Sequence, residues 1–241
     1  MTPSLPPKPR SELLRLEFTR LPRLTPGRRL VRRLLQGLAR LLVWLCTRSS
    51  VSGLENLHRT GPALVATNHL GDADTLIAVA LSPVLFEVVA KMELYEIPLV
   101  GALMEAYGVI WIHRGQPDRR ALRAILDGLQ EGRLVSIAPE GRESLSGSLE
   151  EGTNGAAFLA LKANVPVLPV TFTGTQNECI YGNLRRLRRT PVSMTVGPPF
   201  YLEPQANRKQ ALDEGTRKIM LALARQLPPE YRGVYRYGAE Q

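Results

Sequence analysis

The sequence predicts an α/β protein in which a mostly parallel sheet is flanked by helices, preceded by a basic amphipathic helical element that docks on a membrane. Two features predict it: apolar runs alternate with helical patterns from Gly61 onward, and the excess positive charge is confined to residues 1–50. With 44% hydrophobic and 22% charged residues, the chain is not collagen-like, coiled-coil or wholly disordered. Its 241 residues fit one large domain with an appendage.

Six apolar runs have the length and residue types of buried strands. They span residues 63–67, 86–90, 109–113, 134–138, 166–172 and 192–196, and helical patterns fit residues 75–81, 98–107, 118–130, 155–163 and 208–227. Such alternation is typical of a parallel sheet with helical connections. Ligands of these sheets bind beyond the carboxyl ends of the strands, so the residues that follow each run are the candidates for chemistry.

Composition divides the N-terminal fifth from the rest. Residues 1–10 are rich in proline and are expected to be a disordered lead-in, whereas residues 11–50 are expected to form a helical membrane-interaction element ahead of the main domain, residues 51–241. The first 50 residues carry a formal net charge of +9, and the remainder holds 20 basic and 20 acidic side chains. This asymmetry predicts a polyanionic partner, either a membrane surface or nucleic acid.

The N-terminal element contains a short predicted helix at residues 11–21 and a longer one from Arg28. In the longer helix, which has Trp44 near its end, leucines recur at spacings of three and four and arginines take the other positions. The apolar positions are Leu30, Val31, Leu34, Leu35, Leu38, Leu41, Leu42 and Leu45. The pattern suits a helix lying in a lipid interface. The alternative is a helix that packs its leucines on the protein's own core and leaves its arginines in solvent.

No segment of the N-terminal element has the length of a membrane span. Its longest apolar run, residues 34–46, is shorter than the roughly 20 residues a span needs, and too many polar residues precede it for a secretory signal. Cys46 and Cys179, the only cysteines, imply no disulfide framework and favour a reducing compartment. We therefore expect a peripheral, monotopic protein at the cytoplasmic face of a membrane.

His69 follows the first predicted strand, and Asp74 lies at the start of the next helix. Positions five apart are about 140° apart on an ideal helix, so the two cannot share a helical face. With Asp72 as N-cap and His69 in the preceding turn, however, the Asp74 carboxylate can fold back onto one imidazole nitrogen and leave the other free to take a proton. General-base catalysis of this kind is worth about 10²- to 10⁴-fold. A capping turn with a structural histidine is the alternative.

Charged residues also follow other predicted strands. Arg114 is suited to bidentate binding of a phosphate, and Lys91 brings a second cation to the same edge. Glu140 and Arg142 flank Gly141, where the backbone can approach a ligand closely. Each of these residues has an ordinary alternative as a solvated side chain or part of a polar turn.

Taken together, four ordered blocks resemble the glycerolipid acyltransferase superfamily, specifically the bacterial 1-acyl-glycerol-3-phosphate acyltransferases of the PlsC type. The resemblance covers roughly residues 61–200. Its blocks are Asn68-His69 with Asp74, which matches the NHx4D signature, residues 108–114, Pro139-Glu140-Gly141, and residues 165–170.

The resemblance implies an enzyme that moves a fatty acyl group from a thioester, acyl-CoA or acyl carrier protein, to a lysophospholipid, above all 1-acyl-sn-glycerol-3-phosphate, giving phosphatidic acid. It implies that His69 is the base and that Asp74 orients it, with no covalent acyl-enzyme, no metal and no further cofactor. It also implies that the lipid bilayer is a partner and nucleic acid is not. The residues it implies for substrate binding are Asn68, Lys91, Arg114, Glu140 and Gly141.

The third block departs from the usual Phe-Pro-Glu-Gly-Thr-Arg-Ser, because Ala138, Arg142 and Glu143 stand at the Phe, Thr and Arg positions. Either Arg142 binds the acceptor phosphate from one position earlier, or the acceptor differs: glycerol-3-phosphate, another lysophospholipid or a lyso-aminolipid. His113 stands where the family often has Asp or Asn, and we assign it no role.

Two other classes of protein stay open on the sequence. Asp72-Ala73-Asp74 is a DxD, which in nucleotide-sugar transferases binds a divalent metal. The N-terminal arginines and the basic run at residues 185–189 fit a membrane- or nucleic-acid-binding module without catalysis. Aromatic residues are not interleaved among these arginines, which disfavours single-stranded nucleic acid.

Overall fold

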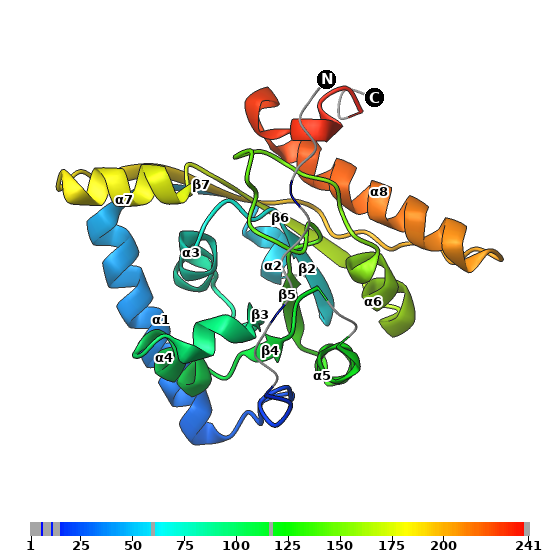
Figure 1. Ribbon diagram of the computed structural model, residues 1–241, viewed down its shortest axis with the longest axis horizontal. Helices are drawn as coiled ribbons and strands as arrows, with labels where there is room; N and C mark the ends of the chain where they lie inside the picture. Colours follow the sequence, from blue (N-terminus) through cyan, green and yellow to red (C-terminus); the bar gives the residue numbers. More distant parts are fainter. Residues whose placement is uncertain (1–5, 7–10, 12–14, 59–60, 116–117, 239–241) are drawn as a thin grey trace.

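The computed structural model describes residues 6, 11, 15–58, 61–115 and 118–238 and places one seven-stranded sheet between two layers of helices (Figure 1). The strands are β1 Thr47–Ser52, β2 Ala63–Thr67, β3 Glu87–Lys91, β4 Ile110–Ile112, β5 Leu134–Ile137, β6 Val167–Thr173 and β7 Thr190–Val196. Their spatial order is β1-β7-β6-β2-β5-β3-β4, and only β6 and β7 pair antiparallel. The predicted α/β fold with a mostly parallel sheet is confirmed.

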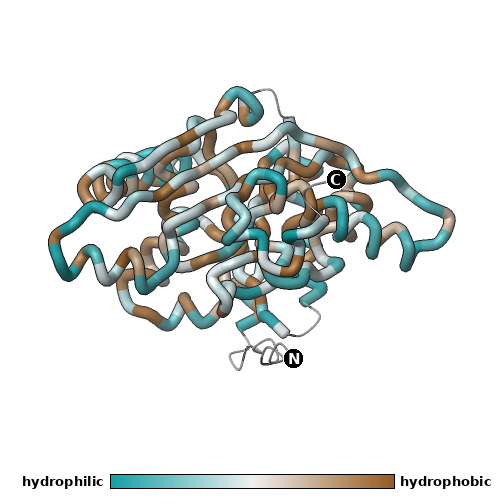
Figure 2. Tube along the Cα trace, turned by 90° about the horizontal axis from the view of Figure 1, so that it is seen from above, coloured by the Kyte–Doolittle hydropathy of each residue, from teal (hydrophilic) through white to brown (hydrophobic). Residues whose placement is uncertain are grey.

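The helices form the two outer layers. They are α1 Pro26–Cys46, α2 Glu55–His58, α3 Ala73–Leu81, α4 Val100–Tyr107, α5 Arg119–Gln130, α6 Gly155–Ala163, α7 Asn177–Arg185 and α8 Arg208–Gln226, with 3-10 turns at Met92–Glu96, Pro229–Tyr231 and Gly233–Tyr235. Helices α1, α3 and α4 share one hydrophobic core with the sheet, and α5, α6 and α8 share the other. In Figure 2, hydrophilic loops gather at both ends of the long axis.

The central strands are apolar because both of their faces are covered. In β2, Leu64 is paired with Val135 of β5 on one side and with Val167 of β6 on the other, and all three are fully buried. Parallel strands of this kind are near-continuous hydrophobic runs rather than alternating ones, which is why the runs in the sequence locate them.

Strand β1 was not predicted. Its sequence, Thr-Arg-Ser-Ser-Val-Ser, is polar, because β1 is an edge strand that pairs only with β7 and most of its side chains are exposed. The strand crosses the boundary expected between residues 50 and 51, so the sheet begins within the N-terminal element. The predicted helix at residues 11–21 is wrong where the structure describes it, since residues 16–18 form a turn. The expected lead-in, residues 1–10, lies outside the described residues except for Pro6.

Helix α1 has the predicted extent, and most of its leucines face outward, as an interfacial helix requires. Its buried residues are Arg32, Gln36, Ala39 and Val43. The exposed leucine face consists of Leu30, Leu34, Leu38, Leu41, Leu42 and Leu45, which are 41–64% exposed, and Trp44 beside it is 64% exposed. The alternative in which the leucines pack on the protein's own core is therefore wrong. In the part of the chain that the structure describes, no helix combines the length and apolarity required to cross a bilayer.

The first half of the inward face of α1 is polar, because Arg32 and Gln36 satisfy the carbonyl ends of two other helices, which have no partners within their own helix. In its second half, Ala39 and Val43 pack in the hydrophobic core. The Gln36 amide donates to the carbonyls of Val79 and Ser82 at the end of α3, at 2.9 and 3.0 Å. Arg32 donates to the carbonyls of Tyr107 and Gly108 at the end of α4, at 2.6 and 2.9 Å. Buried donors thus meet buried acceptors, and the leucines are left for the outer side.

Candidate active site

The candidate site lies at the carboxyl ends of four neighbouring parallel strands. In the order β2-β5-β3-β4, these strands lead into His69, Glu140, Lys91 and Arg114. The residues that the sequence singled out are therefore brought to one edge of the sheet, as expected for open α/β sheets. They differ, however, in whether their side chains are free to meet a ligand.

His69 and Asp74 form the expected contact, with 3.0 Å between His69 Nδ1 and Asp74 Oδ2. The same oxygen accepts the backbone N–H groups of Leu70 and Gly71 at 2.7 and 3.1 Å, so the Asp74 carboxylate is an acceptor and the imidazole donates its Nδ1–H. Asp72 takes the N-cap position of α3, although its side chain makes no capping hydrogen bond. Among the described residues nothing bonds to His69 Nε2.

The imidazole remains accessible while its carboxylate partner is buried, with side-chain exposures of 30% and 5%. Burial lowers the pKa of His69, but the hydrogen bond and charge of Asp74, with the charges of Glu143 and Glu140, outweigh it and raise that pKa above its ordinary value. His69 and Asp74 line a pocket of about 70 Å³ whose wall includes Phe86, Val88 and Phe172. The geometry can therefore supply a general base beside an apolar surface.

A clamp from α7 holds the turn between His69 and Asp74. The Asn177 Oδ1 accepts the backbone N–H of Asp72 at 3.0 Å, and its Nδ2 donates to Glu143 Oε1 at 2.6 Å. A Cβ added at Gly71 would lie 2.5 Å from the Thr175 carbonyl oxygen, so only glycine permits this close approach. Asn177 thus joins the histidine turn to the third block. The sequence offered no signal for it, because α7 was not predicted.

Glu140 supports the histidine turn through both of its carboxylate oxygens. Its Oε1 accepts the backbone N–H of His69 at 3.1 Å and its Oε2 accepts that of Glu150 at 2.7 Å, while the residue is 1% exposed. Burial raises the pKa of Glu140 to about 7, against the lowering effect of these two N–H donors. The carboxylate was expected to contact substrate; its geometry is that of a positioning residue for His69.

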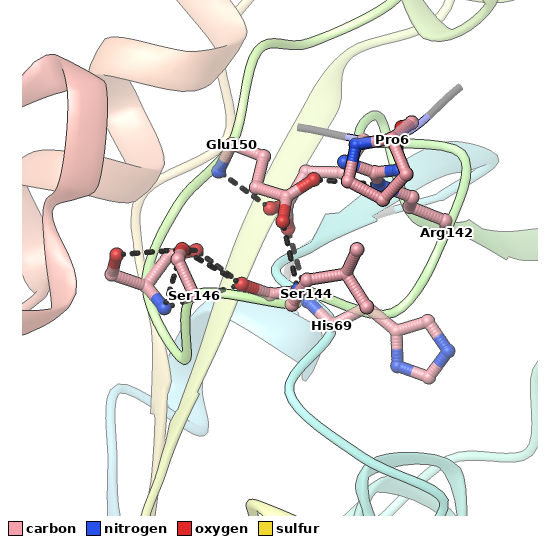
Figure 3. Close-up of polar contacts among 9 residues, drawn as sticks. Pro6, His69, Arg142, Ser144, Ser146 and Glu150 are labelled. Carbon is pink, nitrogen blue, oxygen red and sulfur yellow. Dashed lines mark hydrogen bonds and ion pairs between the residues drawn. The ribbon is translucent and has the colours of Figure 1, made fainter. Parts of the chain in front are cut away.

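Arg142 is occupied within the third block. Its Nε donates to Glu150 Oε2 at 2.7 Å and its Nη1 to the Pro6 carbonyl at 2.7 Å, and the residue is 6% exposed (Figure 3). The expectation that Arg142 binds the acceptor phosphate is thus not supported, because a buried guanidinium that already faces a carboxylate has little left to offer an anion. The neighbouring Gly141 is exposed with φ +72°, the conformation that a turn there requires.

Asn68 is also occupied. Its amide donates to the Phe172 carbonyl at 2.9 Å and accepts the Phe172 N–H at 2.8 Å, so it joins the end of β2 to β6. With only 2% exposure, it is out of reach of a substrate, contrary to the expected binding role. The side chain substitutes for the ladder hydrogen bonds that end with the strand.

Lys91 and Arg114 are the predicted cations that remain half-buried at this edge of the sheet. Burial raises the pKa of Glu93, but hydrogen bonds from Ser11 and from the Glu93 backbone, together with the charges of Arg114 and Lys91, outweigh it and lower that pKa. Burial and Asp72 raise the pKa of Glu143, against the charges of His69 and Lys91. Lys91 therefore acts on both groups. Arg114 Nε is buried without a hydrogen-bond partner among the described residues.

His113, to which we assigned no role, forms a second histidine–aspartate pair. Its Nδ1 lies 2.7 Å from Asp118 Oδ2, and the spacing of the pair equals that of His69 and Asp74. Its Nε2 accepts the backbone N–H of Arg15 at 3.1 Å, and the side chain is 2% exposed. Both ring nitrogens are used inside the protein, so this pair fastens the N-terminal segment to the end of β4.

A larger cavity, of about 320 Å³, lies at the opposite end of the sheet. Its wall includes Arg32, Arg133 and Glu87 near the amino ends of the strands. These charges satisfy one another: Arg32 pairs with Glu87 at 2.6 Å, and Arg133 lies 3.4 Å from the same carboxylate. Because the described residues that line this cavity include no free base or nucleophile, the smaller pocket at His69 is the candidate active site.

A histidine held by a buried carboxylate, with its second nitrogen open to a pocket, can serve as a general base toward a hydroxyl group. A family model described as Acyltransferase matches residues 48–173, which is more than half of the chain. The protein belongs to this acyltransferase family.

Curated relatives and a solved structure agree with this assignment. A 1-acyl-sn-glycerol-3-phosphate acyltransferase of Borreliella burgdorferi is 29% identical over 57% of this chain and 56% of that protein. One of Chlamydomonas reinhardtii is 32% identical over 79% of this chain and 58% of that protein. The chain spans about half the length of the curated relatives it matches first. The PlsC acyltransferase of Thermotoga maritima has the same fold, with TM-score 0.63, 24% identity, and coverage of 80% of this chain and 78% of that one.

Proposed function

We propose that the protein is an O-acyltransferase that moves a fatty acyl group from a thioester to 1-acyl-sn-glycerol-3-phosphate, giving phosphatidic acid. One observation carries the proposal: His69 Nδ1 is held by Asp74 at 3.0 Å while the imidazole stays 30% exposed at a pocket. This is the arrangement a general base needs to take a proton from an acceptor hydroxyl.

In the proposed reaction, His69 Nε2 takes the proton of the acceptor hydroxyl as its oxygen attacks the thioester carbonyl. The tetrahedral intermediate then collapses, the carbon–sulfur bond breaks, and the imidazolium returns the proton to the leaving thiolate. The products are an ester and a free thiol, so atoms and charge balance without a covalent acyl-enzyme. Asp74 accepts the Nδ1–H throughout, which keeps Nε2 as the accepting nitrogen.

We assign the acceptor phosphate to Lys91 and Arg114 rather than to Arg142. Arg142 is paired with Glu150 and the Pro6 carbonyl, whereas Arg114 has a buried Nε without a partner among the described residues. Lys91 follows β3, which lies beside β4, the strand that precedes Arg114. Two cations at adjacent strand ends suit a phosphate monoester, which carries up to two negative charges.

The hydrocarbon chains of the substrates extend beyond the pocket, in our proposal, toward a membrane. The pocket of about 70 Å³ is far smaller than the roughly 300–1,000 Å³ of small-molecule sites. On the same side of the sheet, α1 presents the exposed leucine face, and α3 and α4 pack directly on α1. An amphipathic helix with arginines and an apolar face suits peripheral docking in a lipid interface, which we assign to the cytoplasmic leaflet.

A transfer assay followed by mass spectrometry tests the reaction. Purified protein is given long-chain acyl-CoA, or acyl carrier protein loaded with the same chain, and a panel of acceptors: lysophosphatidate, glycerol-3-phosphate and lysophosphatidylcholine. We expect conversion of lysophosphatidate and a loss of about 100-fold or more in the His69→Ala variant. Conversion of a different acceptor would keep the chemistry and reassign the acceptor, in line with the altered third block. Full activity of His69→Ala with unchanged circular dichroism would reject the mechanism.

A further inference from the structure

The loop that joins α7 to β7, which we call the arginine loop, is a highly charged and fully exposed part of the surface. It consists of Arg185, Arg186, Leu187, Arg188 and Arg189, and every one of these side chains is exposed. None of the ion pairs formed within the described residues includes these arginines. The loop forms the left end of the molecule in Figure 1, and that end is mostly hydrophilic in Figure 2.

Leu187 stands where a glycine is favoured. Helix α7 ends in a Schellman motif, in which the N–H of Arg188 bonds to the carbonyl of Asn183 at 2.9 Å and that of Leu187 to the carbonyl of Leu184 at 3.0 Å. The left-handed position of this motif is usually glycine, yet Leu187 occupies it with φ +53°. Its side chain is 94% exposed, so packing within the protein does not compensate for the strain. A partner outside the protein would explain the leucine.

The arginine loop lies beside the end of α1. Arg189 Nε donates to the Thr47 carbonyl at 2.7 Å, and the Arg189 guanidinium carbon is 5.9 Å from the centre of the Trp44 ring. Trp44 and Leu45, both more than half exposed, belong to the outer side of α1. Cations and exposed apolar side chains are therefore continuous from the exposed leucine face to the arginine loop.

We propose that the arginine loop is a second membrane contact, in which its arginines bind the phosphates of anionic phospholipids and Leu187 enters the interface. This inference rests on the proposed docking of α1. Guanidinium groups match phosphate oxygens bidentately, and a leucine between arginines adds an apolar contact that a lipid interface accepts. Nucleic acid is the less suitable partner, because a lone leucine and Trp44 offer no series of stacking surfaces.

A second contact would fix the orientation of the protein on the membrane. A single amphipathic helix fixes which of its faces meets the lipid but still lets the protein rock about the helix axis, and a contact to one side of that axis restricts this rocking. The same helix that ends in the arginine loop begins with Asn177, which holds the histidine turn and Glu143. Helix α7 would thus connect lipid binding at one end with the candidate active site at the other.

The test compares vesicles of phosphatidylcholine alone with vesicles that also contain phosphatidylglycerol, by flotation of the full chain. The variant Arg185→Gln/Arg186→Gln/Arg188→Gln removes three charges, each worth about five-fold in partitioning to an anionic surface. We expect a loss on the order of 100-fold on anionic vesicles and little change on neutral ones. The control triple, Lys209→Gln/Arg217→Gln/Arg225→Gln, removes the same charge from exposed positions of α8 in the other helical layer and should change binding little.

Leu187→Gly separates function from folding. Because it relieves a strained position, it should leave the melting temperature equal or higher, while it weakens binding to anionic vesicles. Equal losses in the two triple variants, or no loss in either, would overturn the proposal, as would wild-type protein that binds neither vesicle. Loss of binding to an RNA homopolymer, with vesicle binding intact, would assign the loop to nucleic acid instead.

The results that would reject the proposed function differ from those that would reject lipid binding by the arginine loop. Absence of acyl transfer in detergent micelles would reject the enzyme reaction while the vesicle comparison still stands. Charged replacements on the exposed leucine face, Leu34→Asp/Leu38→Asp, should abolish binding to both kinds of vesicle. If they do not, docking by α1 is rejected, and a remaining preference for anionic vesicles would still report on the arginine loop.

Discussion

Replacing Arg32 by methionine should destabilise the protein strongly, because this arginine fastens α1 to the rest of the fold. Arg32 is 1% exposed and pairs with both oxygens of Glu87 at 2.8 and 2.6 Å. It also donates to the carbonyls of Tyr107 and Gly108. Arg32→Met leaves a buried carboxylate and two buried carbonyls without these donors.

The magnitude follows from the partners that remain. Removing one member of a buried ion pair costs about 3–5 kcal/mol. Arg133 stays 3.4 Å from the Glu87 carboxylate, which favours the lower end, about 3 kcal/mol. For a chain of 241 residues this corresponds to a fall of roughly 6–12 °C in melting temperature. Thermal unfolding followed by circular dichroism, with urea unfolding for the free energy, measures both quantities.

Arg33→Met is the matched control, since Arg33 is the next residue of α1 and is exposed. Its effect should stay within about 0.5 kcal/mol. The double variant Arg32→Met/Glu87→Met should recover part of the loss, because it removes the unpaired carboxylate together with its partner. The reasoning is refuted if Arg32→Met and Arg33→Met lose the same unfolding free energy. It is also refuted if the double variant loses more unfolding free energy than Arg32→Met and Glu87→Met lose together.

Three further predictions concern the candidate site. The transfer rate should rise with pH through a midpoint above 6.5, because neutral imidazole is the proposed base and the pKa of His69 is raised. Burial also raises the pKa of Glu140, which positions His69, to about 7, so both groups should titrate in this range. Because Asp74 raises the pKa of His69, Asp74→Asn should lower both the rate and the midpoint in a pH series. A midpoint below 6.5 in the wild type would contradict this. His113→Ala should lower the melting temperature but keep most of the rate, and inactivity of the folded variant would count against a structural role. Asn177→Ala should reduce kcat more than it raises KM; a change in KM alone would exclude positioning.

The sequence located most of the sheet because burial on both faces demands apolar runs. The run at residues 63–67 matches β2, and that at residues 134–138 differs from β5 by one residue. It did not reveal β1, whose polar residues lie at an edge, or α7, which has no buried residue to produce a periodic pattern. Elements with mostly exposed side chains carry a weak hydrophobic signal, so pattern alone misses them, whereas the buried edge strand β4 was found from its apolar run.

The orientation of α1 shows a different limit. The spacing of its leucines predicted the helix and suited an interfacial leucine face, but it left open the alternative in which that face packs on the protein's own core. That face is chosen by the ends of α3 and α4, whose carbonyls require donors from Arg32 and Gln36. This requirement lies in residues more than 40 positions away along the chain, as the separations of 43 and 75 between the bonded residues demonstrate. No local pattern in α1 could contain it.

The site was predictable where the contact is local. His69 and Asp74 are five residues apart, so turn geometry alone suggested their hydrogen bond. Asn68 and Arg142 were expected to bind substrate and are instead used inside the protein. The partner of Asn68 lies 104 positions away, and Arg142 meets Glu150, eight positions away, and the Pro6 carbonyl, 136 positions away. A polar residue at a strand end has the same chemistry whether it meets a ligand or a distant backbone group, and only the fold distinguishes the two.

The two histidine–aspartate pairs also show that a side chain open to a ligand differs from one used inside the protein only by its surroundings. Each has four residues between its members and a short contact from Nδ1 to a carboxylate, at 3.0 Å for His69 and 2.7 Å for His113. The carboxylate therefore does not by itself make a base. What differs is the second nitrogen: in His113 it accepts an N–H from Arg15 in a buried setting, whereas in His69 it has no partner among the described residues. A proton can move from substrate to enzyme only where that nitrogen is both unoccupied and accessible, and of the two histidines this condition favours His69 as the proposed base.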